Sequence, residues 1–129
     1  MIFGTGIDLI GIQRIQKSLE KKDVQFCQSL FTKNEIQYCK RTRNRQVQSQ
    51  CFAARFAAKE AFFKALGTGL RDGLSWKDVE IENNDLGKPS LLLKNKALEV
   101  IQSNEIDNIQ LSISHDKTHA TAVVILEKL

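Results

Sequence analysis

Glu60 and Lys64 are two of the four charged residues in the stretch RFAAKEAFFKALGTG at residues 55–69, which otherwise consists mainly of alanine, phenylalanine, leucine and glycine. On a helix, with about 100° between successive residues, both fall on a face made of phenylalanine and alanine, whereas Lys59 and Arg55 point elsewhere. An ionised carboxylate between aromatic rings is costly unless it is paired or bound to a metal. The pattern alone fits equally well an exposed Glu–Lys pair four residues apart, which contributes about 0.2–0.5 kcal/mol.

A second carboxylate, Asp8, follows two glycines in the segment GTGID near the N-terminus. The glycines leave room around this side chain, which we expect at the end of a strand. A strand-end aspartate that meets a helical glutamate offers two hard oxygen donors with space for water and phosphate oxygens, as Mg²⁺ requires. Asp8 and Glu60 are therefore candidate metal ligands, although aspartates at strand ends more often cap turns.

The hydrophobic pattern predicts an α+β fold in which helices pack on one face of a small, mostly antiparallel sheet. A strand over residues 2–10 contains glycines that let another backbone approach closely. The capping box at 32–35 starts one helix, and an alanine-rich helix from about 46 to 66 stops at Gly67-Thr68-Gly69. The other elements expected are a helical segment from Ile12 to Leu19, a basic loop at 40–46, strands at 79–81, 89–93, 109–114 and 120–126, and a short helix at 95–103.

Length and charge limit the class of protein. A chain of 129 residues suits one domain, 1–129, and no stretch approaches the roughly 20 apolar residues that span a bilayer. The N-terminus lacks the features of a secretory signal, so we expect a cytoplasmic protein. Residues 1–64 carry twelve Lys and Arg against five Asp and Glu, whereas 65–129 carry seven against ten. The basic half favours an anionic partner: nucleic acid, a phosphorylated ligand or an acidic protein.

The chain has three cysteines, Cys27, Cys39 and Cys51, and no CxxC pair. An odd and sparse set argues against a disulfide framework and against a cysteine zinc site, so we expect free thiols. His115 and His119 have the spacing of an HxxxH metal pair, but that spacing brings two ligands together only on a helix. Because the residues that follow are strand-like, we expect no zinc there.

Six segments occur together in a characteristic order and cover the chain from Gly6 to Ile125. They are GIDLIGIQRI at 6–15, FTKNE at 31–35, RFAAKEAFFKALGTG at 55–69, WKDVEI at 76–81, GKP at 87–89 and SISHDKTHATAVVI at 112–125. On these segments the chain resembles the holo-[acyl-carrier-protein] synthases, the small bacterial type of 4′-phosphopantetheinyl transferase. The long central segment combined with GID before it and SISH after it is highly specific, whereas either alone is weaker.

The resemblance implies a reaction that supports fatty acid biosynthesis: Mg²⁺-dependent transfer of the 4′-phosphopantetheine arm of coenzyme A to a serine of apo acyl carrier protein, with release of adenosine 3′,5′-bisphosphate. The family's metal carboxylates fall on Asp8 and Glu60, and its lysine falls on Lys64. Phosphoryl transfer depends on positioning and charge neutralisation, which a metal on these carboxylates and the lysine would supply. The base that takes the serine proton stays open between a metal-bound water, Glu60 and Asp8.

The resemblance also implies contacts with coenzyme A. They fall on Arg55, Lys64, Gly67, Thr68, Gly69, Ser114 and His115. The serine and histidine lie at a strand end, where the family contacts the ribose-phosphate part of the coenzyme. From the residues alone, the glycine turn at 67–69 is a plain helix stop. Arg55 points away from Glu60, which suggests that it serves a different edge of the site.

The family binds its acidic carrier protein on the first helix. Arg14 matches the family's arginine there, and Lys21 is the next candidate; the alternative is a solvated helix face. Trp76 fits either an apolar carrier contact or a half-buried core position. The family commonly forms homotrimers with sites between neighbouring subunits, so we expect a homotrimer here.

Two rival interpretations remain. A small basic α+β domain could bind nucleic acid, but the phenylalanines concentrate at 52–63 on a helix rather than on strands, where bases would stack. The chain could also be an inactive relative, against which the intact Asp8, Glu60 and Lys64 speak. We expect neither a nucleic acid nor a membrane as partner.

Overall fold

The structure, a computed structural model, describes all of residues 1–129 and contains five strands, four α-helices and one 3₁₀ helix. In chain order they are β1 (Ile2–Gly11), α1 (Ile12–Leu30), α2 (Lys33–Cys39), α3 (Arg45–Leu66), η1 (Trp76–Asp78), β2 (Val79–Asn83), β3 (Pro89–Leu93), α4 (Asn95–Ser103), β4 (Asn108–His115) and β5 (His119–Glu127). One antiparallel sheet has the order β1-β5-β4, and β2 and β3 form an antiparallel hairpin. The predicted α+β class is confirmed.

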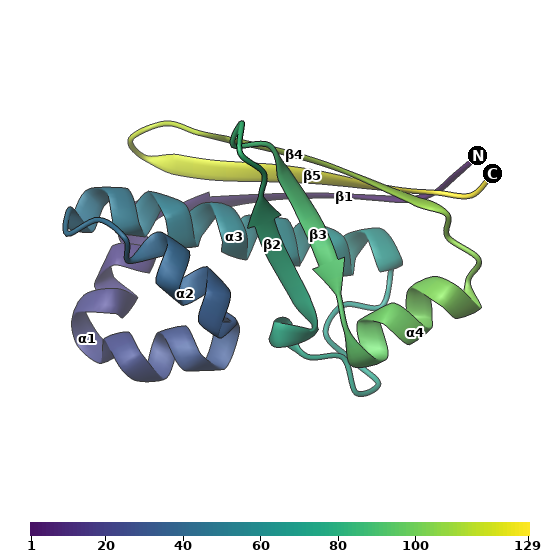
Figure 1. The fold of residues 1–129 in the computed structure, drawn as a ribbon, viewed down its shortest axis with the longest axis horizontal. Coiled ribbons are helices and arrows are strands. Elements are labelled where there is room, and N and C mark those ends of the chain that lie inside the picture. Colours follow the sequence, from purple (N-terminus) through teal and green to yellow (C-terminus); the bar gives the residue numbers. More distant parts are fainter.

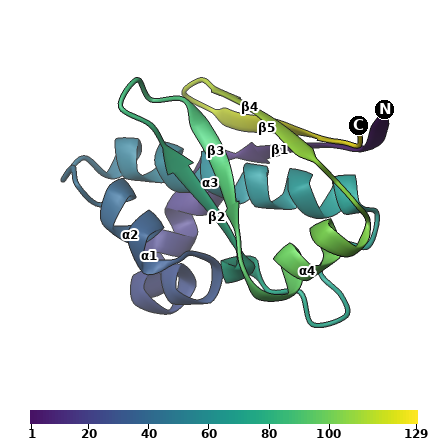
Figure 2. The same cartoon turned by 45° about the vertical axis from the view of Figure 1, so that its right-hand side comes forward.

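Helix α3 lies at the centre of the molecule. The three-stranded sheet runs along one side of it, and the β2–β3 hairpin crosses another side (Figure 1). Helices α1 and α2 pack near one end of α3, and α4 lies toward the other end. Figure 2 shows the same arrangement from a second direction, with the hairpin standing across the central helix. Segments from both halves of the sequence therefore meet on α3.

Strand β1 packs so closely on α3 that two positions have no room for a side chain. Alternation along the strand turns Gly4, Gly6 and Asp8 toward the helix. A Cβ added to Gly6 would lie 1.9 Å from the carbonyl oxygen of Ala61, and one on Gly4 would lie 2.0 Å from that of Ala65. The close backbone approach expected from these glycines is confirmed, and it brings the aspartate of the strand onto the helix.

Helix α3 begins and ends at local signals near the predicted boundaries. The side chain of Asn44 accepts a hydrogen bond from the backbone nitrogen of Val47 at 3.1 Å, and Gly67, with φ of 83°, ends the helix. The side of the helix that carries Lys59 and Arg55 is also buried, since these residues are 0% and 4% exposed. Periodicity placed these residues away from Glu60 but did not show that α1, α2 and the hairpin cover them.

The first two helices also follow their sequence signals, with one extension. Helix α1 continues to Leu30, well past the predicted Leu19, and is kinked at Lys22, where the backbone leaves helical geometry. The capping box of α2 is confirmed: the backbone nitrogen of Glu35 donates to Oγ1 of Thr32 at 3.3 Å, and that of Thr32 donates to Oε1 of Glu35 at 2.9 Å. The end of α1 and the start of α2 thus form a fixed corner.

Cys39, at the end of α2, forms a disulfide with Cys51 in α3, so the expectation of free thiols is wrong at these two positions. Helix α3 already begins at Arg45, which leaves only residues 40–44 between the helices. This short connection turns the chain back until the Cα atoms of the two cysteines are 5.5 Å apart. A count of cysteines carries no information on such a turn. Cys27 is free and buried.

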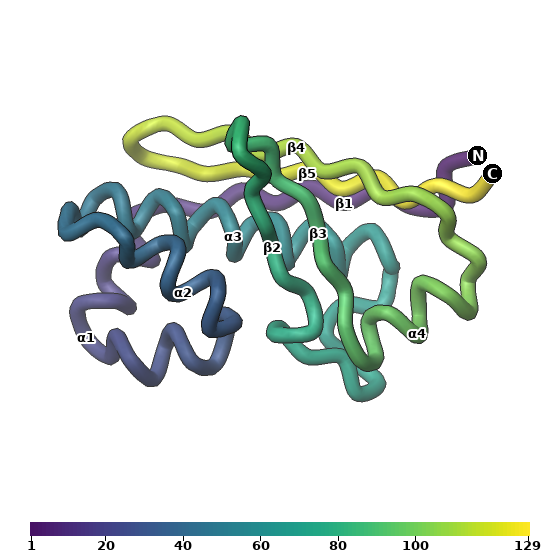
Figure 3. The backbone as a smooth tube through the Cα atoms, viewed as in Figure 1, coloured from purple at the N-terminus to yellow at the C-terminus, as the bar shows by residue number.

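The two termini lie side by side (Figure 3). The amino group of Met1 donates to the carbonyl oxygen of Lys128 at 2.6 Å, and the backbone nitrogen of Lys128 donates to the carbonyl oxygen of Met1 at 2.8 Å. None of the helices has the length and apolar character that crossing a membrane requires.

Candidate active site

Asp8 and Lys64 meet where β1 crosses the C-terminal half of α3. The Nζ of Lys64 donates to Oδ1 of Asp8 at 3.1 Å and to the carbonyl oxygen of Ile7 at 3.0 Å. The expected strand-end position of Asp8 is wrong, because β1 continues to Gly11. The strand is fixed at this point, since Oγ1 of Thr121 donates to the carbonyl oxygen of Asp8 at 2.8 Å. A cation on a flexible stem therefore reaches an anchored carboxylate.

Glu60 lies within electrostatic reach of both residues. Its pKa is raised, first by partial burial and then by the negative charge of Asp8, while Lys64 and Arg14 act in the opposite direction. The ion pair of Lys64 is made with Asp8, so the interpretation as a simple Glu–Lys pair on one helix does not describe the structure. The three residues that the sequence singled out are brought together.

This donor set fits a magnesium ion. Two neighbouring carboxylates, one with its pKa raised by partial burial and by the charge of the other, gain from a cation that both can contact. The chain has no cluster of three or more Asp, Glu, His or Cys. A metal held by Asp8 and Glu60 would therefore complete its coordination with water and ligand oxygens, which is how Mg²⁺ binds in phosphate-transfer sites.

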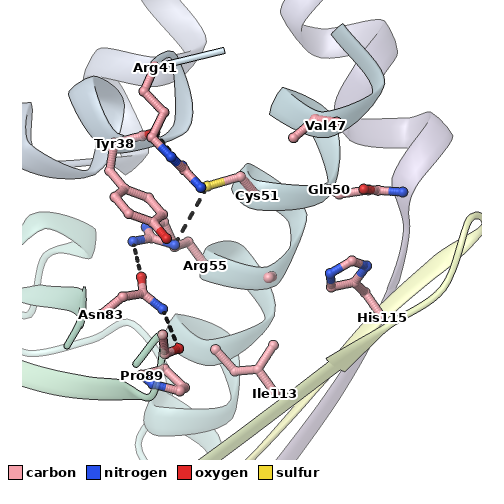
Figure 4. A pocket seen from close by; sticks show the side chains of 12 residues that line it. Tyr38, Arg41, Val47, Gln50, Cys51, Arg55, Asn83, Pro89, Ile113 and His115 are labelled. Carbon is pink, nitrogen blue, oxygen red and sulfur yellow. Dashed lines mark hydrogen bonds between the residues drawn. The ribbon is translucent and has the colours of Figure 1, made fainter. Parts of the chain in front are cut away.

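A second candidate site lies on another side of α3. A cavity of about 370 Å³ opens between α2, α3, the β2–β3 hairpin and the end of β4 (Figure 4). Arg55 lines it from α3 and His115 lines it from β4, and Tyr38, Arg41, Cys51 and Asn83 are among its other lining residues. No residue of the carboxylate site lines this cavity. The structure therefore separates the predicted coenzyme contacts into two groups.

Arg55 is held in this cavity by neighbours that come from distant segments. Its Nη2 donates to Oδ1 of Asn83 at 2.7 Å, and its guanidinium carbon lies 4.5 Å from the centre of the Tyr38 ring. Its Nε has no hydrogen-bond partner. Burial lowers the pKa of Arg55, against the charge of Glu35. The guanidinium group nevertheless lines the cavity, where its positive charge is suited to attract an anion.

The other predicted coenzyme contacts lie at the surface. Gly67 and Gly69 have φ values of 83° and 65°, which L side chains rarely adopt. Between them, Oγ1 of Thr68 donates to the carbonyl oxygen of Gly69 at 3.1 Å. Ser114 and His115 are exposed at the end of β4. The glycine turn follows α3 directly after the carboxylate site, whereas His115 belongs to the Arg55 cavity.

Helix α1 presents the residues expected to bind the carrier protein. Arg14 and Lys21 are both exposed, and Arg14 is near enough to Glu60 to affect its pKa. The basic side of α1 therefore adjoins the carboxylate site. Trp76 is half-buried and stacks on Phe56 with ring centres 5.3 Å apart, which agrees with the core interpretation of this tryptophan.

The sequence interpretation missed a buried ion pair one residue before Glu60. The Nζ of Lys59 donates to Oε1 of Glu35 at 2.7 Å, and also to the carbonyl oxygens of Leu30 and Trp76 at 2.8 and 3.0 Å. Both charged side chains are 0% exposed. Burial lowers the pKa of Lys59, against the charge of Glu35. In the sequence, the capping box already accounted for Glu35. Only the presence of Glu35 in FTKNE and of Lys59 in RFAAKEAFFKALGTG, two of the segments that carry the family resemblance, pointed to a further role.

The structure thus combines an α+β scaffold with two neighbouring carboxylates, an exposed lysine and a cavity lined by an arginine, a set of groups suited to bind a phosphorylated ligand. A sequence model of the 4′-phosphopantetheinyl transferase superfamily matches residues 4–124. Holo-[acyl-carrier-protein] synthase of Geotalea daltonii is 47% identical over 128 residues, covering 99% of this chain and 100% of the relative. The chain belongs to the 4′-phosphopantetheinyl transferase superfamily, which confirms the resemblance seen in the sequence.

Solved structures extend the likeness to the fold. Holo-[acyl-carrier-protein] synthase from Neisseria meningitidis has a TM-score of 0.89 at 31% identity, covering 99% of this chain and 100% of that one. The enzyme from Bacillus anthracis, in complex with CoA (3′,5′-ADP), has a TM-score of 0.83 at 39% identity, covering 100% and 99%. Since the family is one of transferases, the nucleic-acid-binding alternative is not retained.

Proposed function

We propose that this chain transfers the 4′-phosphopantetheine arm of coenzyme A to a serine of apo acyl carrier protein, releasing adenosine 3′,5′-bisphosphate, with Mg²⁺ on Asp8 and Glu60. The observation that carries this proposal is the meeting of these carboxylates with Lys64 on a scaffold shared with the holo-[acyl-carrier-protein] synthases. The proposal takes residues 1–129 as one catalytic domain that acts in the cytoplasm to support fatty acid biosynthesis.

Each side chain has a task that follows from its place. A bound Mg²⁺ would neutralise charge on the pyrophosphate and polarise the phosphorus. Asp8 and Glu60 would hold that ion at the junction of β1 and α3. Lys64, whose side chain is 53% exposed, can follow the charge that develops on the transferred or leaving phosphate. Arg14, next to the same junction, would bring the acidic carrier and its serine to this place.

The nucleotide end of coenzyme A requires the second site. Arg55 and His115, which line the same cavity, would bind phosphate and ribose-phosphate oxygens there. Because this cavity and the carboxylate site lie on different sides of α3, one chain offers two half-sites. We therefore propose a homotrimer in which the cavity of one subunit completes the carboxylate site of its neighbour.

The outer face of the three-stranded sheet supports this assembly. On β1 the side chains of Ile7 and Leu9 are 64% and 67% exposed, on the face that points away from α3. Neighbouring β5 contributes Val123 and Ile125 to the same face, by their pairing with β1. An apolar face that includes large aliphatic side chains is typical of a surface that another subunit covers.

The function is tested by incubating apo acyl carrier protein with the enzyme, coenzyme A and Mg²⁺ and measuring the intact mass of the carrier. We expect a gain equal to one phosphopantetheine arm, with adenosine 3′,5′-bisphosphate as the second product. The control omits Mg²⁺ after treatment with a chelator and should give no gain. An unchanged mass with several different carrier proteins would contradict the proposal.

A further inference from the structure

The Cys39–Cys51 disulfide forms part of the wall of the Arg55 cavity. Cys51 lines the cavity, and Nη1 of Arg55 lies 3.6 Å from its sulfur (Figure 4). Tyr38, the residue before Cys39, contacts two guanidinium groups. The centre of its ring is 3.8 Å from the guanidinium carbon of Arg41 and 4.5 Å from the guanidinium carbon of Arg55. The disulfide therefore fixes the end of α2, with its tyrosine and arginine, against the helix that carries Arg55.

A separate set of contacts holds the same connection without the disulfide. Asp23 on α1 accepts hydrogen bonds from Nζ of Lys40 and, at 3.3 Å, from Nη1 of Arg45, at the two ends of the loop. Burial tends to raise the pKa of Asp23, but these cations lower it. The ion pairs oppose loss of the fold when the sulfur–sulfur bond opens. What the disulfide adds is the position of Tyr38 and Arg41 in the cavity.

The two sulfurs differ in how a reagent can reach them. Cys39 is 0% exposed, whereas Cys51 is only half-buried and borders the cavity. A disulfide in a cytoplasmic protein is usually transient, and serves catalysis or redox sensing rather than permanent cross-linking. The place of this bond, reachable at one sulfur and beside an anion-binding arginine, agrees with such a use.

We propose that the Cys39–Cys51 disulfide is a reversible modification site for dithiol reductants, and that its state sets the affinity of the Arg55 cavity for the nucleotide end of coenzyme A. Both halves of this proposal take the protein to act in the cytoplasm, and the second half also rests on the proposed function of the cavity.

The exchange balances with a dithiol as the reductant. One thiolate of the dithiol attacks the sulfur of Cys51, which breaks the protein disulfide and releases Cys39 as a thiolate that takes a proton. The second thiolate of the dithiol then attacks the dithiol's other sulfur, which is bonded to Cys51 in the mixed disulfide. This step releases Cys51 as a thiolate, whose negative charge the neighbouring Arg55 stabilises. The dithiol ends as a disulfide, and the protein gains two electrons and two protons as two thiols.

Reduction should weaken nucleotide binding because the cavity loses a fixed wall. Tyr38 and Arg41 would then lose the covalent link to α3, and more of their ordering would be left to the ligand. By linkage, a nucleotide that prefers the disulfide form must also protect the disulfide from reduction by the same factor. Binding and reduction thus give two independent readings of one coupling.

Cys27 supplies the matched control. It is buried, and its pKa is raised to about 11, mainly by that burial, so little reactive thiolate forms at neutral pH. Its sulfur interacts with Asp23 rather than with a second cysteine. A Cys27→Ser variant should therefore keep the redox response, whereas Cys39→Ser, which changes a residue outside the cavity lining, should abolish it.

The experiment uses the full chain prepared without reductant and after treatment with dithiothreitol. Alkylation under denaturing conditions followed by mass measurement should find one free thiol in the first preparation and three in the second. Calorimetric titration with adenosine 3′,5′-bisphosphate should show at least about fivefold weaker binding after reduction. Cys39→Ser should bind like the reduced protein in both preparations, and Cys27→Ser should respond like the wild type.

The outcomes separate the two proposals. Three free thiols in the untreated protein would show that the disulfide does not form. Equal nucleotide affinity of the two preparations would overturn the coupling but leave the cavity assignment intact. Absence of nucleotide binding in both preparations would overturn the assignment of the cavity itself. A redox response in Cys39→Ser, or none in Cys27→Ser, would assign the effect to another residue and contradict the proposal.

Discussion

Two lysines on α3, five residues apart, are used in opposite ways. Lys59 is 0% exposed, and its ammonium group donates to a carboxylate and two carbonyl oxygens, so all three of its hydrogens are engaged. The side chain of Lys64 is 53% exposed, and its partners are Asp8 and one carbonyl oxygen. A saturated buried cation holds a structure together, whereas an exposed cation with a single carboxylate partner is free to exchange it for a ligand.

The buried pair also supports the open site. Lys59, the residue directly before Glu60, ties three elements to α3. It binds the end of α1 at Leu30, the start of α2 at Glu35 and η1 at Trp76. The end of α1 is thereby fixed relative to Glu60. The adjacent residues Lys59 and Glu60 thus have different surroundings: Lys59 is buried and binds α1, α2 and η1, whereas Glu60 lies near Asp8 and Lys64.

The largest expected effect tests this contrast through stability. Lys59→Met leaves Glu35 charged and unpaired in the interior and should lower the free energy of unfolding by about 3–5 kcal/mol. Lys64→Met, the same change at the exposed pair, should cost less than about 1 kcal/mol. Urea denaturation of both variants measures the difference.

Lys59→Met could fail to fold, and a double variant keeps this prediction testable. Adding Glu35→Met removes the stranded charge and should recover part of the lost stability, because paired burial of two apolar side chains is often tolerated. Equal losses in the two single variants would show that the lysines do not differ in the way their burial implies.

A large effect on activity is expected at the carboxylate site. Glu60→Gln keeps the shape of the side chain but removes half of the carboxylate pair, and turnover should fall by about 10³-fold or more. The matched control is Glu99→Gln on α4, an exposed glutamate far from the site in sequence and in place, which should leave turnover unchanged. The mass assay of the carrier protein measures both. Retained activity in Glu60→Gln would remove this residue from the metal site.

These residues also show what a sequence can predict. Glu60 and Lys64 could be related because helix periodicity fixes their spacing, and the close approach of β1 could be inferred because glycine has no other reason to alternate there. The functional roles of Asp8 and Lys64 came from the resemblance. The partner of Lys59 lies 24 residues away, and its pairing depends on how α1 turns into α2. The Cys39–Cys51 bond likewise depends on a loop geometry that no periodicity encodes.

A smaller effect is expected where α1 meets the carrier protein. Arg14→Glu places a negative charge beside Glu60 and against an acidic partner, and should weaken carrier binding by about 10- to 100-fold. Binding of coenzyme A should change much less, because its nucleotide end is assigned to the Arg55 cavity. Lys96→Glu on α4, at the other end of the molecule, is the charge-matched control (Figure 1). Equal losses for carrier and coenzyme would contradict the carrier assignment.

The smallest effect is the pH dependence of the metal-free protein. The folded-state pKa of Glu60 is raised by burial and by Asp8, so its ionisation disfavours folding. The stability that comes from the protonated form is present below the ordinary pKa of glutamate and is lost as pH rises through the raised value.

The variant Glu60→Gln cannot ionise at this position. At pH 7 without divalent ions it should therefore be slightly more stable than the wild type, by less than about 1 kcal/mol because the site is partly exposed. This difference should vanish as pH falls below about 4, where both forms are neutral at this position. Thermal unfolding across this range measures it, and a wild type that is more stable than the variant at pH 7 would show that the pKa of Glu60 is not raised in the folded protein. In contrast to Lys59, whose loss should destabilise the protein at every pH at which Glu35 is charged, the carboxylate of the open site is held at a small cost to folding, as expected of a group kept for its ligand.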